Sequence, residues 1–239
     1  MRQSTCSCIK TSDKNVIYPI YEEDIICGGV LGTFGCDMDK LVDKEFEKIT
    51  PVYTLGKYAF EKMYFLGLGK RSEITTMKLR KAFGTLIKEL KEPVLFVAKR
   101  AVTDEIDIQK VSGLFAETYL LTKYKEQVAG HETEEVPEAE VLSPDEDVQE
   151  TIQRAVIYAE GINHARKLAD TPSNFMTPED FAADAVQVAE RYGMECEILD
   201  KTALEEMGAG GILAVNQGSH VPARMVCLKY TGAGDAPYK

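Results

Sequence analysis

Short apolar segments alternate with longer amphipathic ones in the first half of the chain, and this alternation constrains the fold more than any other feature. Residues 16–21, 62–67 and 93–99 are apolar and bounded by charge or glycine, which predicts buried strands. Residues 74–90 and 106–124 repeat apolar side chains at helical spacing, and the first of these helices is expected to cross over between two strands. The pattern predicts an α/β fold, in which helices cover the faces of a sheet.

A change of composition marks a predicted domain border. Residues 130–147 contain eight acidic residues, two prolines and no Lys or Arg, which is typical of a linker, with one edge strand expected around Val141. We therefore predict an α/β domain over residues 1–130, an acidic linker over 131–147, a connector helix over 148–169 and the start of a second domain over 170–239.

Local signals define the next helix closely. Thr177 is a good N-cap, Pro178 suits the first helical position, and Asp180 stands three residues after the cap, where its charge favours the positive end of a helix. Gly193 is expected to end this helix as a C-cap. Its predicted buried face consists of Phe181, Ala185, Val188 and Tyr192. After it we expect strands over residues 194–200, 210–215 and 223–230, with a short helix over 202–207.

Composition excludes several classes of protein. Hydrophobic residues are 44% and charged residues 28% of the 239 residues, so a disordered chain or a fibre is excluded. The net charge of −11 repels a phosphate backbone, and no nucleic-acid partner is expected. No apolar run is long enough for a secretory signal or a membrane span, so we expect a cytoplasmic protein without a membrane partner. Six scattered cysteines, expected to be reduced thiols, are Cys6, Cys8, Cys27, Cys36, Cys196 and Cys227.

Histidines and paired carboxylates do not form a catalytic pattern. His131, His164 and His220 lie apart, and none belongs to a sequence that places two metal ligands on one helical face. The acidic pairs are Glu134–Glu135 and Glu205–Glu206. Both lie in polar settings that do not shift carboxylate pKa values, so we interpret them as solvated surface.

Two further segments could either bind a ligand or have a purely structural role. Cys6 and Cys8 supply only half of a tetrahedral zinc site, and we favour an inert N-terminus. The run Gly28–Gly35 (GGVLGTFG) could bring backbone amides close to a phosphate, but it lacks the spacing of a phosphate loop, so we favour a turn before a helix at Asp37. Taken alone, the residues support no mechanism.

The stretch over residues 161–230 resembles the leucyl aminopeptidase (cytosol aminopeptidase) family of two-metal exopeptidases. The matching pieces are GINHARKLADTPSNFMTPEDFA, the strand MECEILD, the run EEMGAGGILAVNQGS and a strand ending at Tyr230-Thr231-Gly232. Residues that match the first family motif are Arg166, Leu168, Thr171, Pro172, Asn174, Thr177 and Pro178. Asp170 replaces the usual first Asn of that motif, which affects a local turn contact.

The N-terminal half looks like the smaller domain of the same family, a macro-domain-like α/β unit, with YFLGLGK and GLFAETYLLTKYK at the expected places. The resemblance therefore implies a macro-domain-like α/β domain, a long connector helix and the truncated start of an α/β peptidase domain.

The family's metal-binding segments, G-K-G-x-T-F-D-[ST]-G-G and N-T-D-A-E-G-R, do not occur in this sequence. Gly69-Lys70 lacks the glycine and Asp that follow in the first of them. For the complete protein, the resemblance implies two divalent ions (zinc or manganese), release of N-terminal residues such as Leu from peptides, and a homohexamer. For this chain we predict an inactive fragment with no catalytic and no metal residues; its substrate-binding residues are unknown. Two rival predictions are an oligomerisation role and a macro-like module that binds a small ligand.

Overall fold

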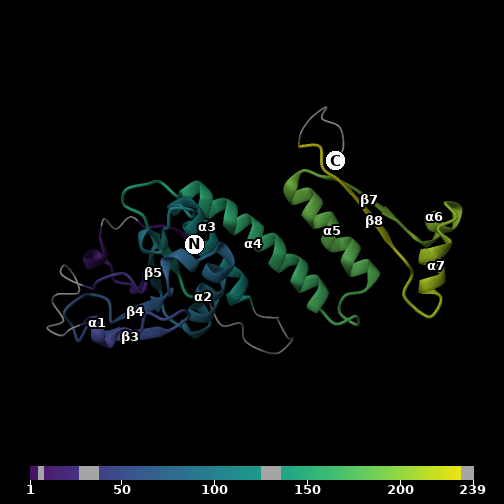
Figure 1. Ribbon diagram of the computed structural model, residues 1–239. Helices are drawn as coiled ribbons and strands as arrows, with labels where there is room; N and C mark the ends of the chain where they lie inside the picture. The colour runs from purple at the N-terminus through teal and green to yellow at the C-terminus, as the bar shows by residue number, and fades with distance from the viewer. Residues whose placement is uncertain (5–7, 27–37, 125–135, 233–239) are drawn as a thin grey trace. The chain divides into compact units, whose positions relative to one another are not determined.

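The computed structural model describes residues 1–4, 8–26, 38–124 and 136–232. The chain forms two compact units, Met1–His164 and Ala165–Lys239, and the division falls within one long helix. Figure 1 labels helices and strands of both units.

The first unit is built on a six-stranded sheet in the order β1-β6-β5-β2-β4-β3. Its strands are β1 (Arg2–Gln3), β2 (Asn15–Ile20), β3 (Ile49–Tyr53), β4 (Lys62–Gly67), β5 (Val94–Val97) and β6 (Ala139–Leu142). All neighbours pair in parallel except β3, which is antiparallel to β4 at the edge. The carboxyl ends of the parallel strands therefore meet at one edge of the sheet.

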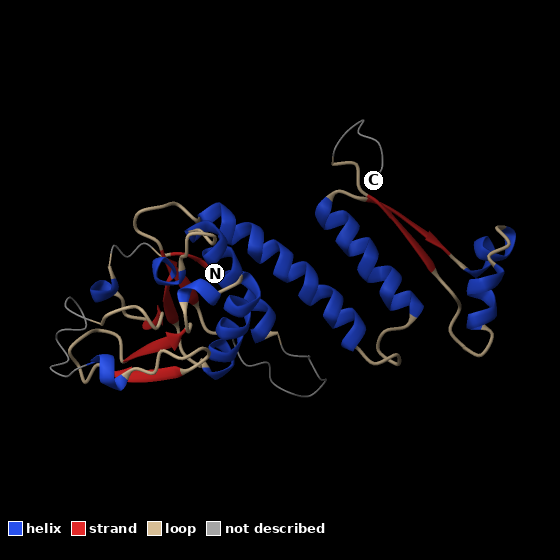
Figure 2. Ribbon diagram, in the orientation of Figure 1, coloured by secondary structure: helices blue, strands red, loops and turns tan. Residues whose placement is uncertain are grey.

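Helices α2 (Thr76–Glu89), α3 (Ile108–Lys123) and the first part of α4 (Gln149–Asp170) cover one face of the sheet (Figure 2). The centre of this core is aromatic: Phe96 of β5 stacks on Phe115 of α3 with ring centroids 3.9 Å apart, and Phe83 of α2 meets both rings edge-on. The opposite face packs against α1 (Met38–Leu41), the short helix η1 (Ile9–Thr11) and the segment before β4. The short helices η3 (Arg71–Glu73) and η4 (Ala98–Ala101) follow β4 and β5.

The α/β fold is confirmed, and the three strands and two helices expected in the first half are present. The strand expected around Val141 is present as β6, but the prediction that it lies at an edge within a linker is wrong: β6 is buried along its length and stands between β1 and β5. Its acidic residue, Glu140, is neutralised by Arg2 of β1 and by Lys14, so an acidic sequence can occupy the sheet interior. Strands β1 and β3 are not among those predicted from the sequence.

The second unit contains α5 (Pro178–Tyr192), β7 (Glu195–Leu199), α6 (Lys201–Glu206), α7 (Gly210–Asn216) and β8 (Met225–Lys229). β7 and β8 form an antiparallel pair. The predicted start of α5 is confirmed: the Thr177 hydroxyl accepts from the Asp180 amide, and the Asp180 carboxylate accepts from the Thr177 amide. Gly193 ends the helix with a φ of 65°.

Two predictions for the second unit are wrong. Residues 210–216 form α7 instead of a strand, because a short apolar run does not by itself distinguish a strand from a helix. The buried face of α5 consists of Ala182, Ala185 and Ala189. Of the four residues predicted for it, Ala185 is buried and Val188 is half-buried, whereas Phe181 and Tyr192 are exposed. Among the described residues, no helix is long and apolar enough to cross a membrane.

Candidate functional site

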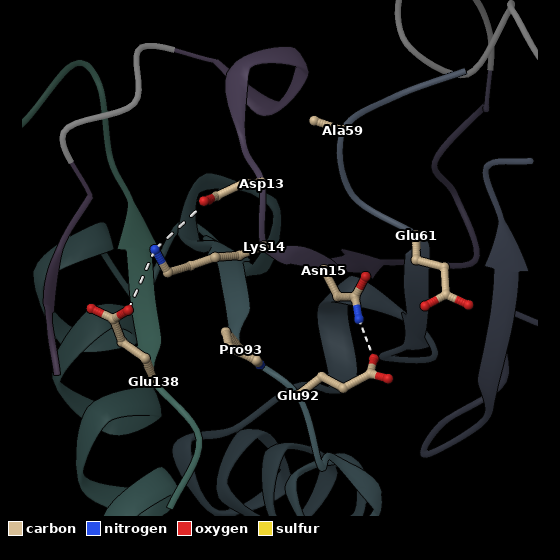
Figure 3. Close-up of a pocket in the computed structure, with 8 residues that line it drawn as sticks. All are labelled: Asp13, Lys14, Asn15, Ala59, Glu61, Glu92, Pro93 and Glu138. Atoms are coloured by element: carbon tan, nitrogen blue, oxygen red, sulfur yellow. Dashed lines mark hydrogen bonds and ion pairs between the residues drawn. The ribbon is translucent and has the colours of Figure 1, made fainter. Parts of the chain in front are cut away.

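A cavity of about 340 Å³ opens at the amino ends of the parallel strands of the first unit. Its lining residues come from the starts of β2, β4, β5 and β6 (Figure 3): Asp13, Lys14, Asn15, Ala59, Glu61, Glu92, Pro93 and Glu138. In open α/β sheets, ligands bind outside the carboxyl ends of the strands, so this cavity lies at the opposite edge from the usual ligand site.

Charged groups around this amino-end cavity largely neutralise one another. Lys14 Nζ lies 3.5 Å from a Glu138 oxygen and 3.4 Å from a Glu140 oxygen. Burial alone lowers the pKa of Lys14, but Glu140 and Glu138 outweigh it and the net pKa is raised. The Asn15 amide donates to Glu92, which Lys62 Nζ also approaches to 3.4 Å. These contacts join the starts of neighbouring strands, which is a structural role.

A second cavity, of about 250 Å³, lies at the carboxyl ends of β2 and β4, and we call it the carboxyl-edge pocket. Its lining residues are Glu22, Phe46, Leu68, Gly69, Lys70, Glu73 and Lys78. Gly69 has a φ of 68°, and a Cβ added there would come within 3.3 Å of the Phe46 Cβ. Its carbonyl accepts from the Glu22 amide at 3.0 Å and its amide donates to the Lys44 carbonyl at 3.1 Å, so backbone hydrogen bonds fix this wall.

An arginine clamp stands beside the carboxyl-edge pocket. The Arg71 guanidinium lies 3.9 Å from the centre of the Tyr21 ring, donates to the Val102 carbonyl at 2.6 Å, and pairs with Asp24 at 2.9 Å. Burial raises the pKa of Tyr21 to about 12, so its hydroxyl stays protonated and donates to the Ala101 carbonyl at 2.8 Å. The clamp holds the ends of β2 and β4 against the segment after β5.

The sequence candidates that fall on described residues are not brought together by the structure. Cys6, Gly28–Gly35, His131 and Glu134–Glu135 lie outside the described residues. Of the others, Cys8, His220, Glu205 and Glu206 are exposed, and His164 is half-buried on α4. Glu205 lies 3.8 Å from Lys201, as on a solvated helix face.

The family motif spans the turn between α4 and α5, and its first residues, Arg166 and Leu168, lie near the end of α4. The Thr171 hydroxyl donates to the Lys167 carbonyl at 2.6 Å, the Phe175 amide donates to the Pro172 carbonyl at 2.8 Å, and Thr177 caps α5. The motif thus ends one helix and begins the next, and its threonine hydroxyls form hydrogen bonds within these helix ends.

The described residues do not fit a pair of divalent ions. In these parts of the chain, no three His, Cys, Asp or Glu side chains are gathered so that they could hold a metal ion. The most buried carboxylate, Glu140, is already held by Arg2, Ser4 and Lys14. Sequence reasoning noted Gly69-Lys70 but missed Glu22, Phe46 and Lys78; the available signal was that Glu22 and Leu68 directly follow predicted strands.

Comparison with protein families gives two matches in chain order. Residues 44–128 match the N-terminal domain of the cytosol aminopeptidase family, and residues 163–239 match its catalytic domain. The probable cytosol aminopeptidase of Bacillus subtilis (strain 168) is 32% identical over 195 residues, which cover 77% of this chain and 39% of that protein. The probable cytosol aminopeptidase of Bacillus licheniformis is 31% identical over 231 residues, which cover 92% of this chain and 46% of that protein. The chain thus spans less than half the length of these relatives.

Solved structures show the same fold. The bottromycin maturation enzyme BotP aligns with a TM-score of 0.76 at 19% identity, over 91% of this chain and 46% of that one. A second structure of BotP, in complex with Mn, aligns with a TM-score of 0.75 at 19% identity, over 92% and 45% of the two chains. A mutant of tomato leucine aminopeptidase aligns with a TM-score of 0.70 at 15% identity, over 92% and 48%. At these identities the likeness concerns the fold alone.

Proposed function

Because this chain belongs to the cytosol aminopeptidase family, we propose that the protein releases N-terminal residues such as Leu from peptides, by hydrolysis that depends on two divalent ions. The observation that carries the proposal is that an N-terminal domain and a catalytic domain of one family match in order along one chain. The alternation of strands and helices and the capped turn at Thr177 agree with that assignment.

Zinc or manganese are the proposed ions. The described side chains do not fit them, so no catalytic step is assigned to residues of this chain. We propose that the metal-binding segments of the complete protein carry that chemistry and that the 239 residues alone are inactive. The absence of both segments from the sequence supports this. A cytoplasmic location and a homohexamer are proposed with the family assignment, and the net charge of −11 argues against a nucleic-acid partner.

An aminopeptidase assay tests both parts of the proposal. Leu-p-nitroanilide is supplied with Mn²⁺ or Zn²⁺ to the 239-residue chain and to a longer form that continues through both metal-binding segments. We expect turnover by the longer form only, and loss of that turnover with EDTA. Chelator-sensitive turnover by the 239-residue chain would contradict its proposed inactivity. A folded longer form without turnover, with either ion, would contradict the aminopeptidase assignment.

A second candidate function is that the first unit binds a small ligand. The carboxyl-edge pocket favours it, because this is the edge of an α/β sheet at which ligands bind. A role in assembly of the chain is the remaining alternative, and the sedimentation coefficient measured over a range of concentrations tests it.

A further inference from the structure

The order of the strands makes the chain leave two neighbouring strands, β2 and β5, in opposite directions. From β2 the chain passes to β4 on one side, and from β5 it passes to β6 on the other side. The connection after β2 leads to α1 on one face of the sheet, and the connection after β5 leads to α3 on the other face. Such a switch point opens a crevice outside the carboxyl ends of the two strands, where open α/β sheets bind ligands.

Two polar side chains stand at this switch point. β2 pairs with β5 as far as Ile17, which lies opposite Phe96, and Tyr18 is the next residue of β2. Arg100 lies in η4, which directly follows β5. The Arg100 guanidinium lies 4.6 Å from the centre of the Tyr18 ring and donates to the Tyr18 hydroxyl oxygen. The two side chains are therefore in contact where the strands diverge.

The charge of Arg100 is not neutralised by a carboxylate. Among the described residues, none lies within ion-pair distance of the guanidinium. Arg100 is half-buried, and this burial lowers its pKa without an opposing negative charge. The adjacent Lys99, in contrast, is exposed and pairs with Asp145 at 2.7 Å.

Most of the Arg100 donors are free. A guanidinium has five N–H donors, and only the bond to Tyr18 uses one of them within the described parts of the chain. In those parts, Ser112 Oγ is the only buried side-chain nitrogen or oxygen without a partner. The free donors of Arg100 therefore face accessible space.

The Tyr18 hydroxyl is a second donor without an acceptor. Tyr18 is only 7% exposed, and its oxygen accepts from Arg100. No described residue accepts the hydroxyl proton, although buried polar groups normally have hydrogen-bond partners. The pair thus combines a positive charge with several donors that lack acceptors. This combination suits an oxyanion and disfavours a cation or an apolar ligand.

We propose that Arg100 and Tyr18 bind the oxyanion group of a small ligand at the carboxyl ends of β2 and β5. The guanidinium pairs with two oxygens of a phosphate or carboxylate group, whose geometry its fork matches, and the Tyr18 hydroxyl donates to one of them. The site goes beyond the proposed aminopeptidase function and does not depend on it, because both residues belong to the first unit.

A titration of the 239-residue chain at constant ionic strength, followed by amide resonances in NMR, tests the site. The probes share a three-carbon frame: glycerol phosphate carries a phosphate, glycerate carries a carboxylate, and glycerol carries neither. We expect saturable shifts in residues 17–20 and 97–101 with at least one of the anions, and none with glycerol. The anion that binds more tightly identifies the class of oxyanion.

Variants assign the contacts. Tyr18→Phe keeps the buried ring and removes only the hydroxyl, and it should weaken binding of the tighter anion about three- to tenfold. Arg100→Lys keeps the charge but removes the fork, and Arg100→Gln removes both, so each should weaken binding by at least about tenfold. Lys99→Gln removes a charge from the next residue and should leave binding unchanged. Unchanged amide spectra away from the site establish that each variant is folded.

Thermal unfolding separates binding from a purely structural role of Arg100. A ligand that binds only the folded state raises the midpoint of unfolding. The tighter anion should therefore raise the midpoint of the native chain more than that of Arg100→Gln. If Arg100 only stabilises the fold, the two chains will respond equally to the anion.

Four outcomes would overturn the inference: no saturable shift with either anion, equal binding of glycerol, undiminished binding by Arg100→Gln, or equal weakening by Lys99→Gln. The measurement does not involve hydrolysis, so failure of the anion to bind leaves the aminopeptidase proposal untouched. Anion binding by a chain whose longer form lacks turnover would support this site and refute only the proposed function.

Discussion

Replacing Glu140 with Gln should loosen the edge of the first unit at which β1 meets β6. The Glu140 side chain is only 6% exposed. It accepts from Arg2 Nε at 2.9 Å, Arg2 Nη2 at 2.8 Å and the Ser4 hydroxyl at 2.8 Å, and Lys14 Nζ lies 3.4 Å away. The substitution keeps the shape of the side chain and removes its charge.

The magnitude follows from the kind of hydrogen bond that is lost. Bonds to a charged group contribute about 1.5–3 kcal/mol each, against about 0.5–1.5 kcal/mol for neutral pairs. Gln keeps one acceptor oxygen but presents an amide group in place of the other. We therefore expect the free energy of unfolding of the first unit to fall by about 1–3 kcal/mol.

Urea unfolding and amide exchange in β1 and β6 measure the effect. Glu138→Gln is the matched control, because Glu138 contacts the same Arg2 and Lys14 but is 49% exposed, and its loss should cost less than about 0.5 kcal/mol. Equal effects of the two substitutions, or no faster exchange in β1 with Glu140→Gln, would refute the reasoning.

The effect should depend on pH with a definite sign. Burial alone raises the pKa of Glu140, but the hydrogen bonds from Ser4 and Arg2 and the charge of Lys14 outweigh it, and the net pKa is lowered. A lowered pKa stabilises the folded state above the unfolded-state pKa, and this stabilisation is lost as the pH falls through the folded-state pKa. The stability difference between the native chain and Glu140→Gln should therefore shrink below about pH 5. A difference that stays constant down to about pH 3 would contradict the assigned cause.

Four further substitutions test the packing of the first unit and the helix cap in the second. Phe115→Ala removes the ring that stacks on its neighbour in the core and should destabilise the first unit by about 3–5 kcal/mol in urea unfolding; a loss below about 1 kcal/mol would contradict the packing. Thr177→Ala removes the capping box and should lower the stability of α5 by about 1 kcal/mol. Amide exchange in the first turn of α5 should become faster, and unchanged exchange there would refute the expectation. Gly67→Ala places a Cβ 2.1 Å from a backbone oxygen and should destabilise the first unit by at least about 1–3 kcal/mol. Gly84→Ala has room for the added Cβ and should be neutral or stabilising. A larger loss of stability from Gly84→Ala than from Gly67→Ala would refute the geometry.

The local elements of this protein were readable from sequence because their signals lie within one or two helical turns. The spacing of apolar residues predicted α2 and α3, and Thr177, Asp180 and Gly193 predicted both ends of α5. The α/β class followed from the alternation of these elements, and the motif around Thr177 indicated the family by resemblance.

Tertiary structure decided what depends on partners distant in the chain. β6 is buried although its segment is acidic, because Arg2, 138 residues before Glu140, supplies the neutralising charge. The burial of small residues on α5 was decided by what packs against the helix, so the larger Phe181 and Tyr192 face outward. The carboxyl-edge pocket likewise joins Glu22, Phe46 and Lys78, which only parallel pairing of β2 with β4 and the fold of the next segments bring together. Sequence periodicity reports local geometry, whereas pairing and charge compensation across the sheet are properties of the folded chain.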